Sequence, residues 1–125
     1  MHHHTLRFAG RGGACAIRLM VASTARERMR GLLGRAPLQA AEGMLLLSCR
    51  MIHTIGMGYP LDLIYLDRYG RVLKVTEALP PLRMDGHWRA RHVLEMAAGE
   101  AARCEIASGI ILPLALIGQS VHVSP

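Results

Sequence analysis

The chain has 125 residues and a mass of 13.7 kDa, the length of one globular domain. Hydrophobic residues make up 51% of the sequence and charged residues 19%, a balance that excludes an intrinsically disordered chain. No apolar run reaches the ~20 residues that a membrane span needs, and the N-terminus lacks a secretory pattern. We therefore expect a cytoplasmic protein. Residues 1–4, with three consecutive histidines, are predicted to be tag-like or disordered, and residues 5–125 to form a single domain.

The charge is positive, with 15 Lys+Arg against 9 Asp+Glu and a net charge of +6. Such a charge can attract nucleic acid. The arginines are scattered, however, and aromatic residues, which would stack on bases, make up only 4% of the chain. We expect a small molecule or another protein as the partner, not nucleic acid.

The three cysteines, Cys15, Cys49 and Cys104, are odd in number and lack CxxC spacing. This pattern argues against a disulfide framework and against a zinc ribbon. It predicts three reduced and mostly buried thiols.

The first third of the chain predicts a hairpin and a helix. Alternating apolar residues indicate strands over 5–9 and 14–21, with a glycine-rich turn between them. Thr24, followed by a glutamate three residues later, is typical of a capping box that opens a helix. An apolar stripe that includes Met29 and Leu32 predicts that this helix buries one face in the core.

Short strands dominate the rest of the chain. Apolar runs or alternation predict strands at residues 43–47, 52–55, 61–66, 71–77 and 90–97. A hairpin loop is expected at 67–70, a polar loop at 82–89 and a short helix at 100–107, and the tail 110–124 is expected to add one or two closing strands. The pattern favours an α+β or mainly β fold with two short helices.

Asp62 is the most unusual polar residue, because it opens a strand and shares its face with Ile64 and Leu66. A carboxylate in such surroundings must be paired or hydrogen-bonded. Two interpretations remain open. Asp62 accepts backbone N–H bonds from the loop 56–58 and fixes that loop, or it pairs with His53 as an acid–base or ligand-orienting pair.

Other side chains have the chemistry of metal ligands or nucleophiles. Possible ligands are Cys49, His53, His87 and His92, with Asp62 or Asp85 as oxygen donors. The segment around Cys49 is expected to be extended, which separates these side chains, so neither a metal ion nor a cofactor is predicted. Cys49 has the residue type of a nucleophile, but nothing in the sequence places a base beside it.

A longer pattern runs through this region. It consists of Glu42-Gly43-Met44-Leu45, Ile52-His53-Thr54, Met57, Tyr59-Pro60, Asp62 and Tyr65-Leu66-Asp67. The pattern resembles the DUF192 family of uncharacterised bacterial and archaeal proteins, and the resemblance extends over about residues 14–110. It implies a compact β-sandwich or barrel, similar to a small jelly roll, with short helices at its side. The signature residues would line one cleft, and they are Met44, His53, Met57, Pro60, Asp62 and Glu95.

Three functions are consistent with these observations. The first is a non-catalytic ligand-binding or accessory module with a small cleft around His53-Thr54, Met57, Pro60 and Asp62. The second is a hydrolase that uses His53 and Asp62, with or without a metal, which requires the two side chains to lie within ~3 Å of each other and open to solvent. The third is an interaction module that uses the apolar tail 110–117, which requires an exposed apolar patch or an unpaired strand edge there.

Overall fold

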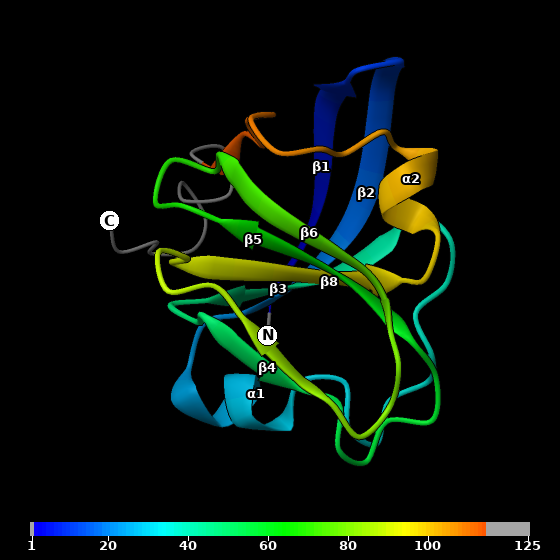
Figure 1. The fold of residues 1–125 in the computed structure, drawn as a ribbon, viewed down its shortest axis with the longest axis vertical. Helices are drawn as coiled ribbons and strands as arrows, with labels where there is room; N and C mark the ends of the chain where they lie inside the picture. Colours follow the sequence, from blue (N-terminus) through cyan, green and yellow to red (C-terminus); the bar gives the residue numbers. More distant parts are fainter. Residues whose placement is uncertain (1, 115–125) are drawn as a thin grey trace.

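The computed structural model describes residues 2–114. It is mainly β, with two short helices, α1 (Ala25–Arg30) and α2 (Glu100–Arg103). The strands are β1 (His2–Gly10), β2 (Gly13–Ala22), β3 (Glu42–Leu47), β4 (Met51–His53), β5 (Leu61–Leu66), β6 (Val72–Leu79), β7 (Met84–Gly86) and β8 (His92–Ala97). Six of them form one mixed sheet in the order β1-β2-β3-β8-β5-β6, and β4 pairs with β7 in a small second sheet. The predicted fold class is confirmed (Figure 1).

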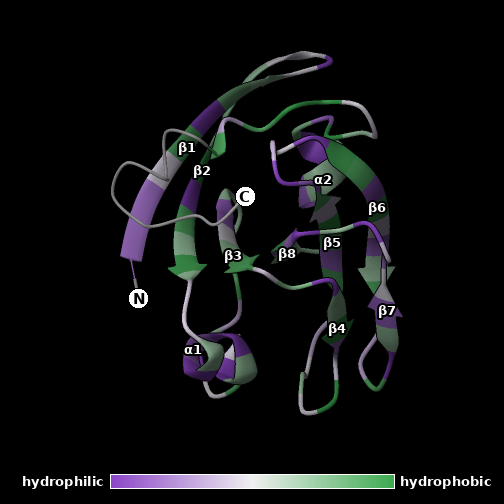
Figure 2. Ribbon diagram, turned by 90° about the vertical axis from the view of Figure 1, so that its left-hand side faces the viewer, coloured by the Kyte–Doolittle hydropathy of each residue, from purple (hydrophilic) through white to green (hydrophobic). Residues whose placement is uncertain are grey.

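The two helices lie toward opposite ends of the molecule. α1 and the β4–β7 sheet lie at one end, while α2 lies toward the other end, where the β1–β2 hairpin projects (Figures 1 and 2). α1 belongs to the connection between β2 and β3, which pair in parallel, whereas every other strand pair is antiparallel. A parallel pair needs such a long crossover.

The central strands β3, β5 and β8 are buried along almost their whole length, because both faces of the sheet are covered. Side chains alternate across a strand, so successive residues enter different clusters. On β5, Ile64 and Leu66 join a cluster with Ala101 of α2, which we call the α2-side core. Leu63 and Tyr65 join a cluster that includes Ile52 of β4 and Leu32, which we call the β4-side core.

The capping box of α1 forms as predicted. Thr24 Oγ1 accepts a hydrogen bond from the Glu27 backbone N–H at 3.1 Å, and Glu27 Oε1 accepts one from the Thr24 N–H at 3.2 Å. The prediction that Met29 packs in the core is wrong, because its side chain is 80% exposed. The helix stops at Gly31, where φ is 50°, so it is too short to present a continuous apolar stripe. Leu32 reaches the β4-side core from the turn that follows.

Two other segments differ from the sequence prediction. Residues 82–89, predicted as a polar loop, contain β7, which forms because β4 supplies its pairing partner.

In the tail, the described residues 110–114 form only an isolated bridge between Ile111 and Arg71, and Leu112 and Leu114 are buried in the α2-side core. The rest of the predicted tail, including the interaction segment beyond residue 114, lies outside the described residues.

The prediction of three reduced thiols is wrong. Cys15 at the start of β2 and Cys104 after α2 form a disulfide across 89 residues, and only Cys49 is free. The Cα atoms of the bridged pair are 5.8 Å apart. Sequence spacing carries no signal for such a pair, because the sheet brings the two segments together from distant parts of the chain.

No helix within residues 2–114 is long and apolar enough to cross a membrane.

We predict that reducing the disulfide destabilises the fold. Closing a loop of this length restricts the unfolded chain and contributes roughly 4 kcal/mol. A reductant should therefore lower the Tm of the parent protein and leave unchanged the lower Tm of the Cys15→Ser/Cys104→Ser variant. Cys49→Ser is the control and should respond to reductant as the parent does. Titration of three thiols in the unfolded, unreduced protein would contradict the assignment.

Candidate ligand-binding site

Asp62 lies on the α2-side face of β5 and is fully buried. Its Oδ1 accepts a hydrogen bond from the backbone N–H of Ala78 at 2.8 Å. Its Oδ2 accepts bonds from the N–H groups of Gly99 at 3.0 Å and Ala101 at 2.9 Å. Asp62 therefore ties the end of β6 to the first turn of α2. It acts as a backbone acceptor, as one interpretation of the sequence proposed, but its donors are not in the loop 56–58.

His53 lies on β4, on the other side of the sheet, and is exposed. Among the described residues, no hydrogen bond or ion pair joins it to Asp62. The hydrolase hypothesis required both side chains to be open to solvent, and Asp62 has no exposed surface. The structure thus keeps these two signature residues on different sides of the sheet.

Hydrogen bonds of Thr54 attach the segment after His53 to residues 80–83. Its buried hydroxyl donates to the Pro80 carbonyl at 2.7 Å and accepts from the Arg83 N–H at 2.9 Å. Its own N–H donates to the Arg83 carbonyl at 2.8 Å. These bonds fasten the end of β4 to the start of β7.

A small cavity of about 70 Å³ lies between the end of α1 and β4. Three of the six residues that the family resemblance places in a cleft line it, namely His53, Met57 and Glu95. Its walls also include Arg28, Arg30, Leu33, Cys49, Met51 and Ile52. The other three signature residues do not line it. Met44 is fully buried, Pro60 is exposed, and Asp62 is on the opposite face of the sheet.

Among the described residues that line this cavity, only Glu95 carries a carboxyl group. Its side chain is 5% exposed, and the structure gives it no hydrogen-bond or ion-pair partner among residues 2–114. In the sheet it lies between Met44 on β3 and Leu63 on β5, both apolar. Burial raises the pKa of Glu95 to about 7. The fully buried side-chain atoms that lack a partner in the described chain are His4 Nε2 and His92 Nε2, so the Glu95 oxygens are not sealed from solvent and open into the cavity.

The cations at the cavity do not neutralise Glu95. Arg28 Nη1 donates to the Ser23 carbonyl at 2.9 Å, and Arg30 Nε makes a long contact of 3.5 Å with the Leu33 carbonyl. The residues that line the cavity thus include one carboxylic acid, Glu95, and two arginines, Arg28 and Arg30.

Cys49 does not have the properties of an activated nucleophile. Burial raises the pKa of its thiol, and its Sγ donates to the Met51 carbonyl at 3.3 Å. A reactive cysteine needs a lowered pKa.

The possible metal ligands are dispersed. No group of three or more His, Cys, Asp or Glu side chains in the described part of the chain could hold a metal ion. The Nδ1 atom of His92 accepts from the Ser48 N–H at 3.0 Å, and the Nδ1 atom of His87 accepts from the Arg89 N–H at 3.2 Å.

Asp85 fixes the small sheet to the large one. Its carboxylate accepts hydrogen bonds from the Tyr65 hydroxyl at 2.8 Å, the Thr76 hydroxyl at 2.7 Å and Lys74 Nζ at 3.2 Å. Burial alone would raise the pKa of Asp85, but these three donors outweigh it and lower the pKa. No local pattern in the sequence indicates this network, because its members come from three different strands.

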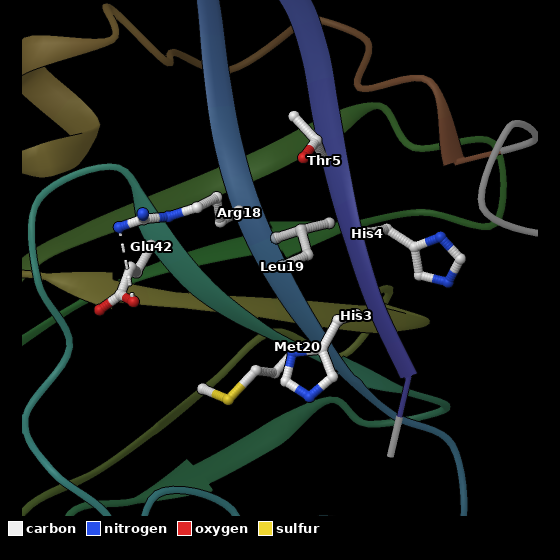
Figure 3. A pocket seen from close by; sticks show the side chains of 7 residues that line it. All are labelled: His3, His4, Thr5, Arg18, Leu19, Met20 and Glu42. Atoms are coloured by element: carbon white, nitrogen blue, oxygen red, sulfur yellow. Dashed lines mark ion pairs between the residues drawn. The ribbon is translucent and has the colours of Figure 1, made fainter.

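The larger hollow at the other edge of the sheet has a different character. It encloses about 420 Å³ beside β1 and β2 (Figure 3). Arg18 and Glu42 in its wall pair with each other at 3.6 Å, so its charges are mutually satisfied. His4 Nε2 has no partner, but His4 itself is only half-buried. We therefore regard the cavity at Glu95 as the better candidate site.

Comparisons with known proteins agree with the fold. The model of the DUF192 family, described as uncharacterized, matches residues 7–113. A protein of unknown function from Novosphingobium aromaticivorans is 26% identical, with a TM-score of 0.79 over 88% of this chain and 84% of that one. A Sinorhizobium meliloti protein titled a "putative transcription regulator" is 21% identical, with a TM-score of 0.80 over 89% of this chain and 92% of that one. No protein with a curated description matches the chain.

Replacing Asp62 should destabilise the fold strongly. In Asp62→Asn an amide NH₂ would face backbone donors that the carboxylate now satisfies, and buried unsatisfied groups cost about 1–3 kcal/mol each. We expect a loss of about 3 kcal/mol in the free energy of unfolding, measured by denaturant titration. Asp67→Asn is the matched control, because Asp67 also accepts two backbone N–H bonds but in an exposed turn, and it should lose about 1 kcal/mol or less. Equal losses would show that burial is not the cause.

Replacing Glu95 should change how stability depends on pH. The pKa of Glu95 is raised in the folded state, from 4.5 to about 7, so the fold binds this proton more tightly than the unfolded chain does. Stability is therefore lost as the pH rises from about 5 to 7, by about 3 kcal/mol. Glu95→Gln should match the parent near pH 5 and exceed its Tm at about pH 8.

The titration of His92 changes stability with pH in the opposite direction to that of Glu95, but it does not affect the comparison of Glu95→Gln with the parent. Burial lowers its pKa from 6.5 to about 4, so it destabilises the fold as the pH falls through that range. His92 is present in both proteins, and its contribution cancels in the difference between them.

The control for Glu95→Gln is Glu77→Gln, at an exposed position of β6. A Glu95→Gln protein with the parent's pH profile would contradict the prediction.

Proposed function

The chain belongs to the DUF192 family of uncharacterised proteins, and we propose that it is a non-catalytic module that binds a small ligand at the cavity between α1 and β4. The ligand places a hydrogen-bond donor or a cationic nitrogen against Glu95. The observation that carries this proposal is that Glu95 is only 5% exposed, lines this cavity and has no hydrogen-bond or ion-pair partner within the described chain.

The comparison with Asp62 supports a binding role for Glu95. Both carboxyl groups are buried and come from neighbouring strands of one sheet. The fold satisfies Asp62 with three backbone donors, whereas it leaves Glu95 facing a cavity without a donor. A ligand that supplies the missing donor gains a hydrogen bond to a charged group, one of the stronger polar interactions available in a protein.

The size and lining of the cavity restrict the ligand. A volume of about 70 Å³ exceeds the ~10–15 Å³ that one water molecule needs on the same measure, so it admits a headgroup such as an ammonium with one or two methylenes. Apolar side chains of Leu33, Ile52 and Met57 contact those methylenes. Arg28 and Arg30 also line the cavity, and their positive charge would attract an anionic group on the remainder of the ligand. The ligand class is therefore a small amine, with a zwitterion as the best fit.

The proposed binding depends on pH through Glu95. An ammonium ion binds the carboxylate and not the neutral acid, so affinity rises as the pH approaches 7 from below. The other titratable or charged groups around the cavity are Cys49, His53, Arg28 and Arg30.

The cytoplasmic location expected from the sequence is not supported by the cysteines. Disulfides persist mainly in oxidising compartments, and the bridge between Cys15 and Cys104 favours such a compartment.

We predict that n-butylammonium binds the protein at about pH 8 and that butyrate does not. Binding is measured by shifts of backbone amide NMR signals, which should concentrate at Gly31, Met57 and Glu95. Lowering the pH to about 5 should weaken the binding at least tenfold.

Glu95→Gln tests the role of the carboxyl, and it is expected to remove the ammonium-induced shifts while the protein stays folded. Glu77→Gln should bind as the parent does. Shifts that persist in Glu95→Gln, or that butyrate reproduces, would refute the proposed site.

A further inference from the structure

Exposed apolar side chains gather at one end of the molecule. Eight large hydrophobic side chains of the described residues are at least 55% exposed. Six of these belong to α1, β4, β7 or the loops that adjoin the two strands, namely Met29, Met51, Ile55, Leu82, Met84 and Trp88. Figures 1 and 2 show α1 and the β4–β7 sheet at the same end. Scattered single residues need no explanation, but such a concentration does.

The contacts make these residues neighbours. In the β4–β7 sheet, Met51 pairs with Gly86 and His53 pairs with Met84, so both pairs lie on the exposed face. Met51 and Trp88 line a common hollow of about 320 Å³. At the other end of the sheet, the Leu82 N–H donates to the carbonyl of Thr54 at 3.3 Å, which places Leu82 beside the residue that precedes Ile55. We call this surface the β4–β7 face.

The charges on this face have one sign. Arg50, Arg83 and Arg89 are exposed, and within residues 2–114 none of them has an ion-pair partner. The Arg89 guanidinium lies 5.0 Å from the centre of the Trp88 ring, and Arg50 contacts the Trp88 carbonyl at 3.4 Å. Asp85 is the only acidic residue in β4, β7 and their adjoining loops, and it is turned toward Tyr65, Thr76 and Lys74.

We propose that the β4–β7 face docks on the surface of an anionic lipid bilayer. Tryptophan prefers the bilayer interface, where its ring is partly apolar and partly polar. Thioether and aliphatic side chains around it enter the acyl boundary, and unpaired arginines are attracted to anionic headgroups. Met29 and Met51 of this face also line the cavity at Glu95, but the proposal does not require a ligand there.

Lipid fits this face better than an acidic protein segment does. The apolar side chains come from separate segments and each stands out from the surface, 55–80% exposed. A fluid lipid surface accommodates such separate insertions. A bound peptide would instead bury most of its surface in one continuous groove, whereas these side chains protrude from the surface.

The test uses the intrinsic fluorescence of Trp88, the only tryptophan in the chain. The full-length protein is titrated with vesicles of phosphatidylcholine containing about 30% phosphatidylglycerol, and with pure phosphatidylcholine vesicles. We expect a blue shift of emission and co-sedimentation with the anionic vesicles, both weakened by salt. Serine in place of Arg50, Arg83 or Arg89 should lower the vesicle affinity about fivefold at each position.

Variants separate this face from the rest of the surface. Trp88→Ala and Met51→Ser/Met84→Ser change exposed side chains, so they should fold normally and lose most co-sedimentation. Tyr69→Ala is the matched control, because Tyr69 is 67% exposed and lies under Arg68, as Trp88 lies under Arg89, but in the distant β5–β6 turn. Three results would overturn the proposal: no blue shift with anionic vesicles, equal weakening by Tyr69→Ala, or tighter binding to an acidic peptide such as polyglutamate than to vesicles.

Discussion

Burial of the central strands on both faces is the constraint on which this structure depends. The strands β3, β5 and β8 have a hydrophobic core on each face of the sheet. Because successive side chains point to opposite faces, each residue along these strands points into one core or the other. A polar residue in these strands has no solvent-exposed face on which to lie. It must find partners inside, or stay unsatisfied at a cost of a few kcal/mol.

Asp62 and Glu95 are two outcomes of this constraint. Asp62 points toward the α2-side core. There its carboxylate accepts hydrogen bonds from N–H groups at the start of α2 and at the end of β6, which would otherwise lack acceptors. Glu95 points toward the β4-side core, where it lines a cavity. Two signature residues of one family pattern thus serve different purposes. Asp62 holds backbone segments of the fold together, and Glu95 is the residue at which we propose that a ligand binds.

The small β4–β7 sheet connects the two surfaces that we propose to be functional. Its inner side closes the β4-side core through Ile52 and anchors to the large sheet through Asp85. Residues of β4 line part of the cavity at Glu95, and the exposed face of the β4–β7 sheet carries Met51 and Met84. A strand of three residues has little stability of its own. Its position therefore depends on the bonds of Thr54 and Asp85.

Much of the fold could be predicted from the sequence because its signals are local. Alternation marked β1, β2 and β8, the capping box marked the start of α1, and the family pattern marked His53, Met57 and Glu95. The length of α1, the existence of β7 and the Cys15–Cys104 disulfide could not be predicted, since each depends on a partner distant in the chain. The sequence by itself determined that Asp62 opens an apolar strand and shares its face with Ile64 and Leu66, because side chains alternate along a strand, but it did not determine that Asp62 and Glu95 would both be buried. Only the tertiary structure decided which of them found hydrogen-bond donors, because those donors belong to α2 and β6, which pack against one face of the sheet and not the other.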